Sequence, residues 1–239
     1  MRVFVLVLAV FLTFGCQKKD DSIQSSQTEK PSASQTPPAV TEQTGKFVIN
    51  PQFDSANNFS EGLAAVRIDD DKTGKWGYID KQGKMAINPQ FDSAFDFREG
   101  LAAVLIGDHK TGKRGFIDKQ GKMVINPQFN SASNFSEGLA AVRIGDDKTG
   151  KWGYIDKQGK MVVNPQFDCD WVCSGFSEGL AAVRIGDDKT GKWGYIDKQG
   201  KMVINPQFDC VWGCSGFSEG LARVLIGDYE TGKWGFISR

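Results

Sequence analysis

The strongest constraint on the fold is that the chain from Gly45 onward repeats one motif five times. The mark K-[WR]-G falls at Trp76, Arg114, Trp152, Trp193 and Trp234, with spacings of 38, 38, 41 and 41 residues. A period of this length is typical of tandem units that bury their apolar faces against their neighbours. We divide the region into repeats 45–82, 83–120, 121–158, 159–199 and 200–239.

Each repeat contains three short apolar runs with the composition of β-strands. In the third repeat they are KMVINPQF (122–129), LAAVRI (139–144) and KWGYI (151–155), and Gly, Asp or Pro bounds each of them. Runs of four to eight residues rich in Val, Ile and aromatics favour strands. No stretch has the 3.6-residue periodicity of an amphipathic helix. The sequence therefore predicts an all-β fold.

Two D-K-x-G-K turns join the runs and predict a three-stranded antiparallel meander. The first contains Asp147 and Gly150, and the second contains Asp156 and Gly159. We expect each Asp to bond backbone N–H groups ahead of it, and each Gly to adopt positive φ in a G1 bulge. We also expect Asn126-Pro127 to end its strand, because proline cannot donate to a ladder.

Both faces of every predicted strand are apolar, so neighbouring repeats must cover each sheet on both sides. Gly153 is expected to leave room beside Trp152 for an aromatic of the adjacent sheet. Stacked meanders give a five-bladed, propeller-like ring or, alternatively, an open β-solenoid. The sequence favours the ring, because Phe47–Asn50 could pair with Trp234–Ile237 and complete the fifth sheet.

The N-terminus has the pattern of an export signal followed by a tether. Arg2 precedes an apolar run that ends at Gly15-Cys16, and this run is too short to span a bilayer. We predict a lipoprotein-type signal peptide over 1–16 with lipid attachment at Cys16; the alternative is an ordinary cleaved signal. Residues 17–44 are polar and Pro-rich, which predicts a disordered tether. Gln17 after the Cys favours the outer membrane.

Two insertions, CDWVCSG and CVWGCSG, add four cysteines to the last repeats. In an exported chain, Cys169, Cys173, Cys210 and Cys214 suggest disulfides. The local pairs 169–173 and 210–214 are favoured, and cross-repeat pairs, a zinc site and free thiols are the alternatives. Trp171 and Trp212 lie inside the insertions as possible binding anchors, or they fold back over their own sheet edge.

The remaining polar residues point to no catalytic centre. Lys+Arg and Asp+Glu both number 29, which argues against nucleic-acid binding, and the single histidine, His109, stands in a turn. The Asp-rich turns lack calcium-loop spacing, so we expect neither a metal nor a cofactor. The glutamates recur at Glu61, Glu99, Glu137, Glu178 and Glu219. One interpretation is that these carboxylates form a shared surface. The alternatives are that each accepts backbone N–H groups or pairs with an arginine such as Arg67, Arg143 or Arg184.

The motifs W-G-[YF]-I-D, G-K and F-S-E-G-L-A, in that order, resemble the WG (KWG) repeat family of bacterial exported proteins. The resemblance covers residues 45–239 and implies a repeat scaffold without a catalytic residue set. We therefore expect a monomeric, non-enzymatic interaction scaffold in the cell envelope, held to the membrane by its lipid. Its partner would be an envelope protein or glycan. The alternative is a glycan- or peptidoglycan-binding module with exposed aromatics.

Overall fold

The computed structural model describes residues 45–239 except 147, 170–171, 188 and 211–212. The predicted signal peptide, Cys16 and the tether over 17–44 lie outside the described residues. Lys46–Arg239 forms one compact unit. The described residues contain strands and turns but no helix, so the predicted all-β class is confirmed.

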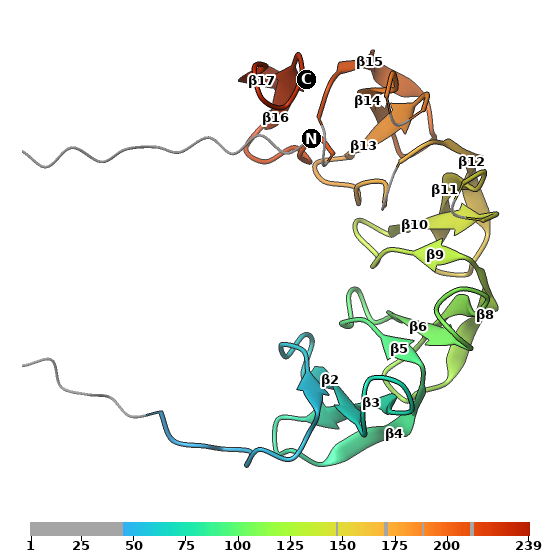
Figure 1. The fold of residues 1–239 in the computed structure, drawn as a ribbon, viewed down its shortest axis with the longest axis vertical. Coiled ribbons are helices and arrows are strands. Elements are labelled where there is room, and N and C mark those ends of the chain that lie inside the picture. Colours follow the sequence, from blue (N-terminus) through green and yellow to red (C-terminus); the bar gives the residue numbers. More distant parts are fainter. Residues whose placement is uncertain (1–44, 147, 170–171, 188, 211–212) are drawn as a thin grey trace, which may run out of the picture. The chain divides into compact units, whose positions relative to one another are not determined.

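Five antiparallel sheets follow one another along the chain (Figure 1). The first contains β1 (Ser55–Ala56), β2 (Leu63–Ile68), β3 (Lys75–Asp80) and β4 (Met85–Phe91), and the second contains β5 (Ser93–Ala94), β6 (Ala102–Ile106), β7 (Lys113–Ile117) and β8 (Met123–Phe129). The third contains β9 (Ser131–Ala132), β10 (Leu139–Ile144), β11 (Lys151–Asp156) and β12 (Met161–Phe167). The fourth contains β13 (Leu180–Ile185), β14 (Lys192–Asp197) and β15 (Met202–Phe208), and the fifth contains β16 (Leu221–Ile226) and β17 (Lys233–Ser238).

The predicted meander is the core of the first four sheets. In the third sheet, β10 pairs with β11 from Leu139↔Asp156 to Ile144↔Lys151, and β11 pairs with β12. The first three sheets also have a two-residue edge strand, such as β9, that the sequence did not predict. Each of the first four sheets therefore starts within one sequence repeat and ends in the next.

The Asn-Pro pair does not end its strand, contrary to our expectation. β12 continues to Phe167, which pairs with Trp152, whereas Val163 pairs with Tyr154. Residues 164–166 thus bulge opposite the single residue Gly153, and a bulge is one of the few places where a strand tolerates proline.

The same bulge explains the glycine of the WG motif. A Cβ on Gly153 would lie against the Val163 carbonyl and 2.8 Å from the Pro165 nitrogen. Gly153 therefore accommodates the backbone of its own sheet, and the expectation that it makes room for an aromatic of the adjacent sheet was wrong.

The two D-K-x-G-K turns differ from each other. In the second turn Gly159 has φ 79° and Asp156 accepts the Gln158 and Lys160 N–H groups, as predicted. In the first turn φ is positive at Gly145 (100°) and not at Gly150. Gly150 is required there because a Cβ would collide with the Gly145 carbonyl. The prediction for Gly150 was therefore wrong.

Neighbouring sheets bury each other through aromatic pairs. The Tyr154 ring lies 4.9 Å from Phe176 of the fourth sheet, and the Tyr154 hydroxyl donates to the Ser174 carbonyl at 2.8 Å. Equivalent ring pairs join Tyr78 to Phe97, Phe116 to Phe135 and Tyr195 to Phe217. This confirms that both faces of the internal sheets are covered by adjacent sheets.

The pairing that would close a ring is not formed. Residues 47–50 belong to no strand, and β17 pairs only with β16 among the described residues. The Phe47 side chain is 70% exposed and Phe236 is 71% exposed. The structure therefore has repeated antiparallel sheets of two to four strands without the predicted closure.

Candidate functional site

The recurring aromatic motif is used for packing. Trp152 is fully buried and its indole N–H donates to the Cys169 carbonyl at 2.8 Å; Trp193 is also buried. Burial raises the pKa of the Tyr195 hydroxyl to about 12 and also raises the pKa of Tyr154. These side chains are therefore closed to a ligand.

An arginine faces the tryptophan on the adjacent strand, and in the second repeat an arginine stands in the place of the tryptophan. The Arg143 guanidinium lies 5.7 Å from the Trp152 ring, and the two residues are cross-strand partners. In the second sheet the corresponding pair is Leu105 and Arg114, and Arg114 donates to the Asn130 carbonyl at 2.7 Å. Arg114 thus replaces the missing tryptophan as a donor to the next sheet.

The F-S-E-G-L segment forms a two-residue hairpin whose side chains reach the next sheet. Glu137 and Gly138 have φ of 52° and 87°, and Ser136 and Leu139 exchange backbone hydrogen bonds. Positive φ at both central residues defines a type I′ turn. The Ser136 hydroxyl then donates to the Phe176 carbonyl at 2.7 Å. The hairpin is therefore a connector between sheets.

The glutamates accept backbone N–H groups, which was one of the predicted roles. The Glu137 carboxylate accepts the Gly179 N–H and forms an ion pair with Lys198, both at 3.0 Å. The structure pairs Glu61, Glu99 and Glu137 with lysines of the next sheet, Lys119, Lys157 and Lys198. The suggested pairing with Arg67, Arg143 or Arg184 is thus replaced by these lysines. Lys119 and Lys157 also donate to a carbonyl 58 residues earlier.

Electrostatics at this link favours the ionised glutamate. Partial desolvation raises the pKa of Glu137, but the hydrogen bond from Lys198 and the Gly179 N–H outweigh it, so the net pKa lies below its usual value. Glu61 behaves in the same way beside Lys119 and Gly100. Sequence reasoning missed the lysines; their recurrence in every D-K-Q-G turn was the available signal.

Both local disulfides are present, Cys169–Cys173 and Cys210–Cys214, each with a Cα separation of 5.1 Å. They replace the cross-repeat, zinc and free-thiol alternatives. Cys169 and Cys173 occupy the places of Ser131 and Ala132, which are consecutive in the third sheet. Each disulfide thus closes off a three-residue insertion at the point where the edge strand of the earlier sheets would lie.

We call residues 170–172 and 211–213 the disulfide-closed loops. Trp171 and Trp212, the predicted anchors, lie outside the described residues. Val172 is 44% exposed, while the four cysteines are buried. The loops therefore start from rigid, buried positions.

A charged cavity of about 380 Å³ lies beside Cys210. Its walls include Arg184, Trp193, Asp209, Asp228 and Tyr229. Arg184 is buried and donates to the Asp168 carbonyl through Nε at 3.0 Å, while Lys192 forms an ion pair with Asp209. Lys192 and Asp209 engage each other, and Arg184 is engaged by a backbone carbonyl, so the cavity has the properties of a polar recess.

The Asp-rich turns are occupied by their own backbone. The Asp146 carboxylate accepts the Lys148 and Thr149 N–H groups at 2.8 Å, so Asp146 has the role predicted for Asp147, which lies outside the described residues. In the second repeat, hydrogen bonds from Thr111 lower the pKa of Asp108 to about 2. His109 follows it as an exposed turn residue. No group of three His, Cys, Asp or Glu side chains able to hold a metal occurs in the described part of the chain.

Comparison with family models identifies the family to which the chain belongs. The model described as "WG containing repeat" matches residues 42–72, 76–108, 115–148, 152–189 and 193–234. These matches cover more than half of the chain, so the protein belongs to the WG-containing repeat family. A comparison with curated proteins finds no match. No helix in the described ranges is long and apolar enough to cross a membrane.

Proposed function

We propose that the protein is an exported, lipid-anchored, non-enzymatic interaction scaffold of the bacterial cell envelope. The supporting observation is that the internal copies of the recurring motif are used in packing between sheets. Trp152, Tyr154 and Glu137 all contact the following sheet. Variable features outside this framework, foremost the disulfide-closed loops, remain to contact a partner.

Export and anchoring are supported by the cysteines and by the N-terminal pattern. The chain has two disulfides, which are common in exported proteins and rare in the reducing cytosol. The apolar run before Cys16 and the polar stretch 17–44 match a lipid anchor with a spacer, and Gln17 after the cysteine favours the outer membrane. Cys16→Ala should move the chain from the membrane to the soluble fraction and abolish fatty-acid labelling. A variant that stays membrane-bound contradicts the anchor.

We favour an open array over the propeller-like ring. Support comes from the absence of pairing between residues 47–50 and β17 among the described residues. An open array keeps both terminal sheets accessible, which suits a scaffold.

The binding surface we propose is formed by the two disulfide-closed loops, with Trp171 and Trp212 as anchors. A disulfide that closes a short loop restricts its conformations and so lowers the entropy cost of binding, and tryptophan is enriched at interaction hot spots. The test is capture from detergent-solubilised envelope with the lipidated chain. Replacing both tryptophans by alanine should remove specific partners that the matched surface variant Val124→Ala retains (Val124 is 42% exposed). Equal capture by both variants would dismiss the loops as the site.

The glycan-binding alternative has less support. An aromatic platform for sugars must be accessible, whereas Trp152, Trp193 and Tyr154 are buried. Co-sedimentation with purified peptidoglycan tests this alternative. If chemical modification of the accessible tryptophans leaves the co-sedimentation unchanged, the chain adsorbs nonspecifically and has no such platform.

A further inference from the structure

The two ends of the repeat array expose complementary halves of the interface that joins its internal sheets. We propose that copies of this chain associate head to tail, with β17 of one copy pairing with residues 47–53 of the next. The occupant of both exposed ends is therefore a second copy of the chain. This interface continues the one that the internal sheets already form.

Residues 47–53 have the sequence of the third meander strand but pair with no strand among the described residues. Their sequence, FVINPQF, matches MVINPQF of β8 and β15 in all but the first residue. Ile49 and Phe53 already pack on the first sheet. The Ile49 side chain lies against Gly83 just as Ile87 lies against Gly121. The segment is thus held in the place of the third meander strand, and only the strand before it is missing.

β17 is the matching strand that lacks a neighbour. Its equivalents β3, β7, β11 and β14 each pair with a following strand, whereas β17 pairs with β16 alone among the described residues. A Cβ on Gly235 would meet nothing within 4 Å, whereas on Gly153 it would strike the Asn-Pro bulge. A strand with the sequence of residues 47–53 would bring that bulge to Gly235. Such pairing is β-strand addition at an exposed edge.

The side chains at the two ends also match. Phe236 is 71% exposed, although its internal equivalent Tyr154 is fully buried, and Phe59 is 43% exposed, although its equivalent Phe176 is buried. In the internal interface these two rings lie 4.9 Å apart. The exposed Phe236 and Phe59 therefore supply the two members of one further ring pair.

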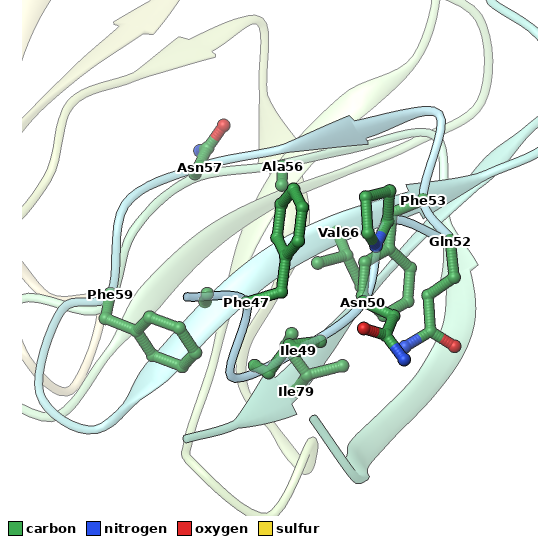
Figure 2. A pocket seen from close by; sticks show the side chains of 12 residues that line it. Phe47, Ile49, Asn50, Gln52, Phe53, Ala56, Asn57, Phe59, Val66 and Ile79 are labelled. Atoms are coloured by element: carbon green, nitrogen blue, oxygen red, sulfur yellow. The ribbon is translucent and has the colours of Figure 1, made fainter. Parts of the chain in front are cut away.

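A pocket on the first sheet is the seat for Phe236. It has a volume of about 290 Å³, and Ala56, Asn57, Phe59 and Val66 are among its lining residues (Figure 2). The equivalent residues of the second sheet, Ala94, Phe97 and Val104, are in the cluster that encloses Tyr78. The pocket thus corresponds to an aromatic seat that every internal interface fills.

Charge at the two ends is complementary. Lys81 occupies the turn position of Lys119, Lys157 and Lys198, each paired with a glutamate of the preceding sheet. Glu219 occupies the hairpin position of Glu137 in the fifth sheet, and no later sheet covers it among the described residues. Glu219 of one copy would pair with Lys81 of the next. The internal register predicts Trp234 opposite Phe53 and Phe236 opposite Ile49.

The interface is heterologous, because it joins different surfaces of the two copies. Repeated head-to-tail contacts give open chains or larger rings. The proposed association differs from the monomer that the sequence suggested, and the experiments below decide between them.

The primary test is the oligomeric state of the full chain carrying Cys16→Ala. It is measured by sedimentation velocity over a range of protein concentrations. We expect the weight-average mass to rise with concentration. Gly235→Ala should keep the chain monomeric at concentrations where the parent associates, with an unchanged melting temperature in dilute solution. The added methyl is harmless in a single copy and collides only with a docked Asn-Pro bulge.

A charge exchange gives an independent test. Glu219→Lys and Lys81→Glu should each weaken association several-fold, because each places like charges together. Mixing the two variants restores an opposite pair at every interface, so association should recover. Failure to recover on mixing overturns the proposed register.

Two further outcomes would overturn the proposed association. A parent chain that stays monomeric overturns the proposal; if Gly235→Ala then lowers its melting temperature, residues 47–53 and β17 pair within one chain. Association that Gly235→Ala leaves unchanged places the interface elsewhere and overturns it too.

Discussion

The third and fifth sheets contain the same motif in opposite surroundings. In the third sheet Trp152 and Tyr154 are fully buried, whereas their counterparts in the fifth sheet, Trp234 and Phe236, are 47% and 71% exposed. The cross-strand registers of β10–β11 and β16–β17 are the same. Burial of the motif is therefore a property of the following repeat and not of the hairpin itself. Each terminal residue serves as a matched control for an internal one.

Removing the internal tryptophan should have the largest effect. Trp152→Ala creates a cavity and leaves the Cys169 carbonyl without its donor, which should destabilise by about 3–5 kcal/mol. Trp234→Ala should cost a small fraction of that in dilute solution, because Trp234 is half exposed. Chemical denaturation at low protein concentration measures both. Equal losses would show that the motif is stabilised within its own hairpin.

The glycine of the motif provides a sharper contrast. Gly153→Ala should destabilise by about 1–3 kcal/mol, because the new Cβ overlaps the backbone of β12. Gly235→Ala should leave the monomer unaffected, because that position faces open space. Thermal unfolding of both variants tests this. A similar loss at Gly235 would mean that β17 has a partner strand.

The fourth sheet differs from the third in having a disulfide where the third has its edge strand. Cys169→Ser with Cys173→Ser should cost about 2 kcal/mol, as expected for opening a closed loop of five residues. Replacing residues 169–173 by the Ser-Ala of the third sheet should recover the loss and form the two-residue edge strand. Urea denaturation compares the three chains. If the Ser-Ala chain remains as unstable as the double serine variant, the equivalence with Ser131-Ala132 is wrong.

The glutamate link should have the smallest effect. Glu137→Gln should cost about 1 kcal/mol at neutral pH, since the link is partly exposed, and Glu219→Gln should cost less in the monomer. The pKa of Glu137 is lowered in the folded state, so the folded chain binds fewer protons than the unfolded one. The link therefore stabilises above the ordinary value of 4.5 and is lost as pH falls through the lower folded pKa. Melting curves of parent and variant should converge below pH 4.5, and a gap that persists in acid would contradict this assignment.

Local patterns predicted the strands and one of the turns. Leu139–Ile144 coincides with β10, and Gly159 has the positive φ of a G1 bulge. These features depend on residues close together in the chain. The Asn-Pro bulge was missed because proline reads as a strand end unless the glycine facing it on the neighbouring strand is known.

Links between sheets were harder to predict. Glu137 reaches Gly179 across 42 residues, and Lys119 reaches the Glu61 carbonyl across 58. An equivalent glutamate recurs in every repeat, and an equivalent lysine recurs in every D-K-Q-G turn, so sequence alone does not identify which two form a pair. The disulfides were easier to predict, since four residues separate each pair.

The sequence by itself determined the number of repeats, the all-β class, the hairpins and the local disulfides, because each depends on a short stretch of chain. Only the tertiary structure decided which face each motif buries, which lysine meets which glutamate, and that residues 47–50 do not pair with β17. The physical reason is that identical motifs have identical local preferences, and only the presence or absence of a neighbouring sheet distinguishes Trp152 from Trp234.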